Sequence, residues 1–182
     1  MKRVLVPMAN GFEEIEAITI IDILRRAGAE VCTAALDKKN VEGSHGLKII
    51  TDAVLDDMLT ENWDMVVLPG GVPGAPNLMA DERIITLLKK QAEDNKTSAA
   101  ICAAPAVLEK AGLTKDQHVT SHPEWADRMT TAIHTGARVE TASQIVTGQA
   151  AGSAMEFAFK LVEVLFGPEK VAEVNTGVLA RL

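Results

Sequence analysis

The sequence predicts an α/β protein with a mostly parallel central sheet covered by helices on both faces. Short apolar runs such as 2–6 and 64–68 lack the alternation of half-exposed strands, which is typical of strands buried on both faces. Helix-length segments separate these runs, and strand–helix–strand order is the unit from which parallel sheets are built. With 182 residues and 47% hydrophobic content, we expect residues 1–182 to form one domain.

The composition limits the classes of partner. A formal net charge of −7 disfavours nucleic acid and anionic membrane surfaces, so small molecules or other proteins are the expected partners. The first apolar run is too short for a signal peptide, and nothing approaches the ~20 apolar residues of a membrane span. Two cysteines without an export signal indicate a reducing compartment. We therefore expect a cytoplasmic protein.

The elements follow in order from apolar runs and from helix-start and helix-stop residues. Gly28 suits the end of the first helix, and Pro105, Pro123 and Pro168 each suit the start of another. The predicted strands are 2–6, 31–36, 47–51, 64–68, 97–101, 118–120, 138–140 and 144–147. The main predicted helices are 13–27, 77–92, one that follows Cys102 and stops at Gly112, 154–166 with Gly152 or Ser153 as its cap, and a last helix from 168.

The segment around Cys102 predicts a strand, a tight corner and a helix. The small, apolar strand 97–101 ends at Cys102, and a helix is expected at once. Unpaired N–H groups and the dipole of that helix would lower the pKa of the thiol, which would make it a nucleophile or an oxidation target. Ala100 and Ala104 partly match the small residues that flank a hydrolase nucleophile elbow. A buried small hydrophobe is an equally supported interpretation of Cys102 alone.

In the first helix, Glu16 falls among apolar residues on the inward face. It is either a first-turn carboxylate that leans into solvent or a neutral carboxylic acid directed at a site. Ile15 and Ile18 fall on the outward face, where they are either ordinary surface residues or contacts with a partner subunit.

Two further loops are expected at the edge that carries Cys102. The turn 69–74, with Gly70 and Gly71, follows a strand, and its amides could cradle an oxyanion. His122 lies on a turn at the end of another strand. Three features on one edge favour a site. The four histidines are scattered and no CxxC or HExxH is present, so no metal is expected.

Four motifs in register resemble the ThiJ/PfpI superfamily, in the branch of the parkinsonism-associated deglycase, the DJ-one protein. They are Gly11–Ala17, Val67–Gly71, Ala100–Pro105 and Ser121–Pro123, and the resemblance covers essentially the whole chain. It implies a flavodoxin-like three-layer sandwich, a cofactor-free site, and a homodimer to which the first helix, with Ile15 and Ile18, contributes.

The resemblance also implies the roles of individual residues. The family's elbow cysteine falls on Cys102, its protonated glutamate on Glu16 and its nearby histidine on His122. The amides that hold an oxyanion fall on Gly71 and Ala103, beside Gly70. The predicted substrate-binding set is completed by His45, Gln149 and Ser153. His45 stands where many relatives have an arginine, and Ala150–Ser153 replaces Gly-Pro-Gly-Thr, so substrate preference is expected to differ.

The expected function is a thiol-dependent enzyme for α-oxoaldehydes such as methylglyoxal or glyoxal, or for their early adducts on amino and thiol groups. Cys102 would form a hemithioacetal, and Glu16 would shuttle a proton through an enediol to a hydroxy acid. The alternative is an oxidative-stress sensor or chaperone in which Cys102 is oxidised without significant turnover. A cysteine peptidase or amidase ranks last, because it needs a carboxylate to orient His122.

Overall fold

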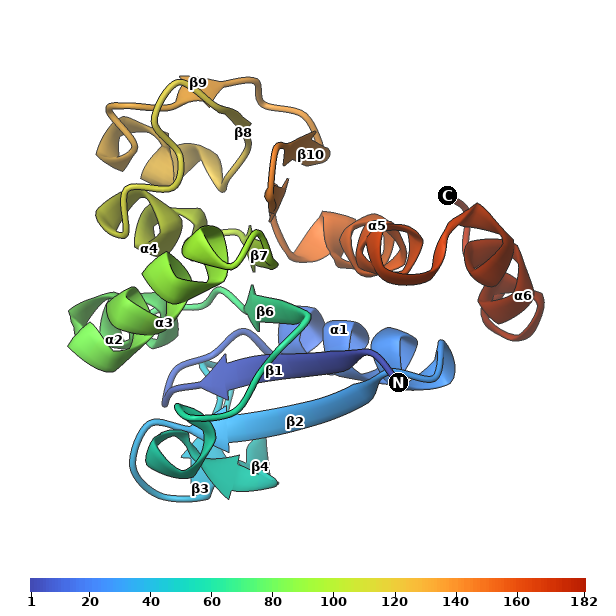
Figure 1. The fold of residues 1–182 in the computed structure, drawn as a ribbon, viewed down its shortest axis with the longest axis horizontal. Coiled ribbons are helices and arrows are strands. Elements are labelled where there is room, and N and C mark those ends of the chain that lie inside the picture. Colours follow the sequence, from blue (N-terminus) through green and yellow to red (C-terminus); the bar gives the residue numbers. More distant parts are fainter.

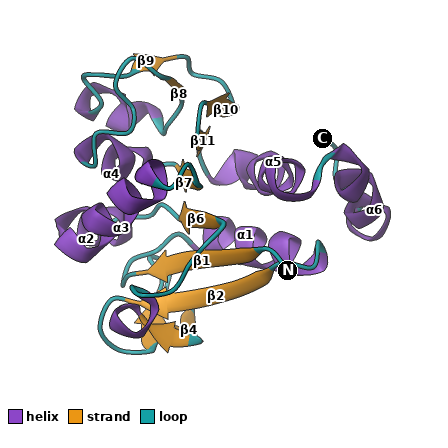
Figure 2. Cartoon of the chain, viewed as in Figure 1, coloured by secondary structure: helices purple, strands orange, loops and turns teal.

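A seven-stranded sheet forms the centre of the molecule in a computed structural model that describes residues 1–182 (Figures 1 and 2). The strand order is β10-β11-β7-β6-β1-β2-β5. The bounds are β1 (Arg3–Met8), β2 (Glu30–Ala35), β5 (Ala53–Val54), β6 (Met65–Leu68), β7 (Thr97–Ile101), β10 (Val139–Ala142) and β11 (Ile145–Gly148). All neighbours are parallel except β10 and β11, which form an antiparallel pair.

Helices cover both faces of this sheet, which explains why its central strands are apolar throughout. One face packs on α1 (Glu14–Arg26) and α5 (Ala154–Phe166), with α6 (Pro168–Val178) against α5. The other packs on α2 (Gly74–Ala80), α3 (Glu82–Glu93) and α4 (Pro105–Lys110) (Figure 2). The predicted α/β fold with a mostly parallel sheet is confirmed. None of these helices is long and apolar enough to cross a membrane.

Two small sheets lie outside the central one. The hairpin of β3 (Asn40–Glu42) and β4 (Lys48–Ile50) is tied to the loop after β1, because the Gly11 N–H donates to the Glu42 carbonyl (2.7 Å). The strands β8 (His118–Val119) and β9 (Ile133–His134) form a parallel pair. Three short 3₁₀ helices complete the fold: η1 (Leu55–Met58), η2 (Pro123–Arg128) and η3 (Ala151–Ser153).

Most predicted elements are confirmed, and the differences have local causes. The strand 97–101 and the helix 154–166 have the predicted bounds. The predicted helix 77–92 is instead two helices, α2 and α3, because Asp81 has an extended backbone and its side chain caps the second helix by accepting from the Arg83 N–H (2.9 Å). Ser153 occupies the cap position of α5, but its hydroxyl bonds to Ala150 and not to the helix.

Candidate active site

Cys102 lies on a strained corner at the end of β7. Its φ is 65°, a left-handed conformation that costs a residue with a β-carbon about 1 kcal/mol or more. Two backbone hydrogen bonds hold it: its N–H donates to the Gly148 carbonyl (3.0 Å), and its carbonyl accepts from the His122 N–H (2.9 Å). The helix α4 begins at Pro105. The residue as a whole is half-buried.

Glu16 lies in the first turn of α1 with no exposed surface. Its Oε2 accepts from the Gly70 N–H (2.8 Å), whereas its Oε1 has no hydrogen-bond partner. A β-carbon built on Gly70 would lie 2.6 Å from Glu16 Oε2 and 2.7 Å from Cys102 Cβ. Glu16 and Cys102 therefore meet across Gly70, and the solvent-leaning interpretation of Glu16 is wrong.

The two side chains shift each other's ionisation. Burial, together with the negative charge of Glu13, raises the pKa of Glu16 to about 7, although the Cys102 thiol and the Gly70 N–H oppose the shift. Burial and the neighbouring Glu16 carboxylate raise the pKa of Cys102 to about 12. Between these two values the pair holds one proton for two acidic groups. The site can thus hold a carboxylic acid and a thiolate, or a carboxylate and a thiol.

The expectation that the pKa of Cys102 falls is therefore wrong: its pKa is raised. The sequence correctly places amides beside the sulfur, and the N–H groups of Ala103 and Gly71 do lower the pKa of Cys102. Burial and the charge of Glu16 outweigh them. The helix α4 starts three residues later and has only six residues, so its dipole adds little at the sulfur.

Gly70 and Gly71 form the floor between these groups. Gly71 has a φ of 97°, and a β-carbon there would overlap the carbonyl oxygen of Gly11 and the nitrogen of Glu13. Only glycine fits this approach of the 69–74 turn to the start of α1. The turn can therefore direct N–H groups from both Gly70 and Gly71 into the site, one to Glu16 and one to Cys102.

His122 follows β8 and caps η2, where its Nδ1 accepts from the Glu124 N–H (3.3 Å). Its backbone N–H bonds to Cys102, which places it beside the corner. The ring contacts the backbone of Glu124 and not its carboxylate, so the acid that a cysteine peptidase needs is not in place.

The other predicted substrate-binding side chains make contacts of their own. The Gln149 Nε2 donates to the Gly136 carbonyl (3.1 Å), and Ser153 is buried with its hydroxyl on Ala150. His45 has 76% of its side chain exposed and pairs with Glu14. Their roles in binding substrate stay predictions.

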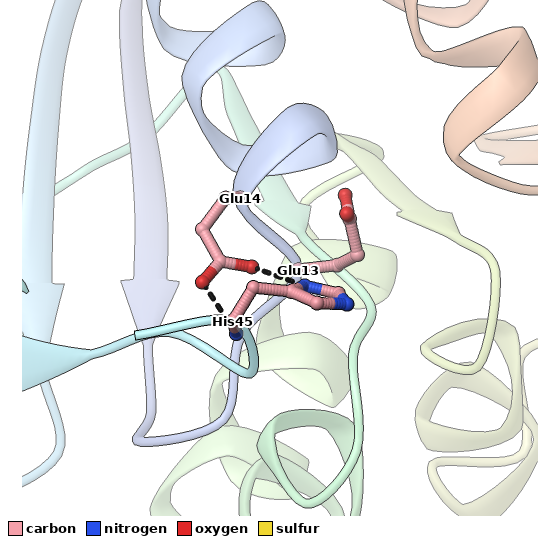
Figure 3. Close-up of side chains that lie close together, drawn as sticks. All are labelled: Glu13, Glu14 and His45. Carbon is pink, nitrogen blue, oxygen red and sulfur yellow. Dashed lines mark hydrogen bonds and ion pairs between the residues drawn. The ribbon is translucent and has the colours of Figure 1, made fainter. Parts of the chain in front are cut away.

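Glu14 is a neighbour of the site that the sequence did not single out. Its carboxylate accepts from the backbone N–H of His45 (2.6 Å) and contacts the His45 Nδ1 (2.9 Å) (Figure 3). It also accepts from the backbone N–H of Leu47 (3.4 Å). Although burial opposes the shift, these hydrogen bonds lower the pKa of Glu14 to about 2. The same contact raises the pKa of His45.

Ligand atoms of Glu13, Glu14 and His45 all lie within 4.8 Å of one another. These groups are already hydrogen-bonded: Glu14 holds the hairpin loop, and the Glu13 Oε2 accepts from the Glu16 N–H (2.8 Å) at the start of α1. We therefore interpret the cluster as a structural link between the β3–β4 loop and α1 rather than a metal centre.

Ile15 and Ile18 point outward from α1, as predicted, with 59% and 41% of their surface exposed.

Comparisons with known proteins give a consistent family. Residues 2–164 match the DJ-1/PfpI family. Protein DJ-1 homolog A of Arabidopsis thaliana is 41% identical over 179 residues, which cover 97% of this chain but 46% of that protein. The chain thus spans about half the length of that curated relative.

Two shorter relatives match over most of their length. The glutathione-independent glyoxalase DJR-1.2 of Caenorhabditis elegans is 36% identical over 160 residues, covering 87% of this chain and 85% of the relative. The crystal structure of Drosophila melanogaster DJ-1beta superposes with a TM-score of 0.96 and 36% identity, covering 100% of this chain and 99% of that one. With its cysteine corner, its buried glutamate and these relatives, the chain belongs to the DJ-1/PfpI family, in the DJ-1 branch.

Proposed function

We propose that this protein is a cofactor-independent enzyme that converts α-oxoaldehydes such as methylglyoxal and glyoxal to hydroxy acids. The observation that carries the proposal is the meeting of Glu16 and Cys102 across Gly70, where one proton serves two acidic groups. The relative named a glutathione-independent glyoxalase supports it. Early adducts of such aldehydes on amino or thiol groups are a second substrate class for the same chemistry.

The reactive form has the proton on Glu16 and the negative charge on the Cys102 sulfur. Amide N–H groups of Gly71 and Ala103 favour that charge, because they lower the pKa of the thiol. The opposite arrangement places the charge on Glu16 and the proton on the Cys102 thiol, and the pKa values of about 7 and about 12 make it the more populated one. Donors of fixed geometry beside the sulfur therefore lower the cost of reaching the thiolate that attacks, which forms from the less populated arrangement of the pair.

The chemistry balances without a redox cofactor. The thiolate adds to the aldehyde carbon, and the resulting oxyanion takes the proton of Glu16 to give a hemithioacetal. The Glu16 carboxylate then removes the hydrogen from that carbon, and the hydroxyl proton passes from the first oxygen to the second, which gives an enediol and then its enolate. Glu16 returns its proton to the neighbouring carbon as the carbonyl re-forms at the first. The product is a thioester of the hydroxy acid, and water hydrolyses it to release lactate from methylglyoxal. His122, beside Cys102, would assist proton transfer or orient the substrate.

Lactate formation from methylglyoxal tests the proposal. We expect Cys102→Ser to abolish turnover and Glu16→Gln to reduce kcat by about 10²–10⁴-fold, the usual contribution of a general acid–base. Two matched controls should stay within a few-fold of wild type. Cys32→Ser changes the other half-buried thiol, and Glu14→Gln changes the other carboxylate of the same helix turn. Unchanged turnover in Cys102→Ser would refute the mechanism.

A redox sensor or chaperone is the second candidate, and the half-buried sulfur beside two amide N–H groups is the observation that favours it. Such donors also stabilise the oxygens of a sulfinate. If wild type makes no lactate while peroxide modifies Cys102 and spares Cys32, this candidate replaces the enzyme. Cleavage of a peptide amide would instead favour the peptidase.

We also propose that the protein forms a homodimer through the outward face of α1. Ile15 and Ile18 are exposed there, and Ile18 shares a surface depression with Met155 of α5. Ile15→Glu should lower the sedimentation coefficient, whereas Ile133→Glu, at an exposed apolar residue of β9, should not. An unchanged profile for Ile15→Glu would count against the dimer.

A further inference from the structure

Ser121 and His134 form a side-chain pair next to His122 of the candidate site. Ser121, which precedes His122, is only 1% exposed. Its hydroxyl lies 3.0 Å from the His122 carbonyl and 2.9 Å from the Nε2 of His134, on β9. A half-buried histidine thus contacts a hydroxyl that bonds to the next residue of the site.

The pair has one arrangement that satisfies every group. A serine hydroxyl has a single proton to donate. When Ser121 donates it to the His122 carbonyl, the Nε2 of His134 must carry a hydrogen and donate to the hydroxyl oxygen. The ring of His134 therefore orients the hydroxyl that holds His122.

The residues that follow His134 also contact both segments that flank Cys102. The Thr120 hydroxyl donates to the Ala137 carbonyl (2.5 Å), and Gln149 donates to the Gly136 carbonyl. The two residues whose backbones bond to Cys102, His122 and Gly148, lie in these same two segments, 120–122 and 148–149. Residues 134–137 thus connect the segments that fix the strained corner.

We infer that His134 is a positioning residue of the proposed reaction: through the Ser121 hydroxyl it fixes the backbone of His122 against the carbonyl of Cys102. The inference rests on the proposed function for its activity readout. It goes further by assigning a role to a second histidine that does not touch the reacting atoms. Displacement of a site residue by about 1 Å can reduce turnover by about 10²-fold, so a remote contact of this kind can be measured.

The test compares three variants of the full chain. His134→Leu removes the donor, and His134→Gln keeps an amide N–H that can reach the hydroxyl. His118→Leu is the matched control, because His118 is exposed on the paired strand β8 and its side chain makes no hydrogen bond. The readouts are kcat and KM for methylglyoxal, hydrogen exchange of the His122 N–H, and the alkylation rate of Cys102 with iodoacetamide.

We expect His134→Leu to lower kcat by about 10- to 100-fold with little change in KM, and to speed exchange of the His122 N–H. His134→Gln should keep kcat and the exchange rate of the His122 N–H close to those of wild type, and His118→Leu should match wild type in both. In a double-mutant cycle, the variant that combines Ser121→Ala with His134→Leu should have a kcat no lower than that of the poorer single variant. The reason is that both substitutions remove the same hydrogen bond.

Two outcomes overturn the inference. In one, His134→Leu leaves kcat and the His122 exchange unchanged. In the other, His134→Gln is as impaired as His134→Leu, so that the ring only fills space. If wild type makes no lactate, the proposed function fails but the inference remains testable, since exchange at His122 and alkylation at Cys102 still compare the variants.

Discussion

Glu14 and Glu16 lie two residues apart in the first turn of α1, yet their environments are opposite. Glu14 faces the β3–β4 loop, where backbone N–H groups of His45 and Leu47 donate to it, and its pKa is lowered to about 2. Glu16 faces the core, receives one N–H from Gly70, and has its pKa raised to about 7. At a helix position the number of available donors, and not the residue type, decides whether a buried carboxylate stays charged.

The difference separates two uses of the same side chain. A carboxylate with several fixed donors is a strong structural link, but it cannot give or take a proton near neutral pH. Glu16 has one oxygen without a donor, so its proton moves at a pH where an enzyme works.

Alanine at the two glycines that pack on these carboxylates should give the largest contrast. A β-carbon on Gly70 would meet Glu16, Cys102 and the Ile101 carbonyl, of which the last two cannot yield easily. We expect Gly70→Ala to separate the pair, to lower lactate formation by about 10²-fold, and to cost about 1–3 kcal/mol of stability.

Gly43 is the matched position: the nearest atoms to a β-carbon there belong to the Glu14 side chain, which can move only by giving up its bonds to the hairpin loop, whereas no atom of Glu16 or Cys102 is among them. Gly43→Ala should therefore retain most turnover and lose less stability than Gly70→Ala. Urea denaturation and the lactate assay on the two variants check the contrast, and equal losses of turnover would contradict it.

The pH dependence of stability should have opposite signs for the two carboxylates. The raised pKa of Glu16 means that the folded state holds its proton more tightly than the unfolded state, so stability is lost as the pH rises from 4.5 to about 7. Glu16→Gln should be more stable than wild type at pH 8, by about 1–3 kcal/mol, and the gain should vanish near pH 4.5.

Glu14→Gln should be less stable than wild type at pH 7, because the lowered pKa of Glu14 stabilises the folded state above the ordinary carboxyl range. Urea midpoints at several pH values measure both variants. If Glu16→Gln is less stable than wild type at every pH, the charge on Glu16 is not what destabilises the folded protein at high pH.

The smallest expected effect is a local opening in acid. As the pH falls from 4.5 towards 2, protonation of Glu14 removes the acceptor of the His45 and Leu47 N–H groups. The NMR signals of these two amides should shift in that range while those of β7 stay in place. Loss of both sets of signals at one pH would indicate global unfolding and would reject a separate loop transition.

Local patterns were enough to predict most of the fold. The run of small and β-branched residues in β7 and the apolar face of α5 were enough to predict where these two elements begin and end. Gly28 has the positive φ expected after α1. The strands β3, β5 and β9 were not predicted, because two or three residues give little periodicity. The break between α2 and α3 could have been predicted, because aspartate is a preferred residue at the start of a helix and Asp81 caps α3.

The candidate site could be predicted in part. Glu16 stood out because a charged residue interrupts an apolar face, and its lack of exposure confirms that signal. The pKa of Cys102 could not be predicted, since it depends on burial and on a carboxylate 86 positions away in sequence. The roles of His134 and Glu14 could not be predicted, because their contacts are with residues that only the folded chain brings close to them.

The left-handed backbone at Cys102 has a consequence for how the protein would evolve under different selections. Glycine adopts that conformation without penalty, so a population selected for heat resistance alone should drift to glycine at position 102. Selection for chemistry should hold the sulfur there in spite of the strain. The residue recovered from each regime would show which demand shaped this corner.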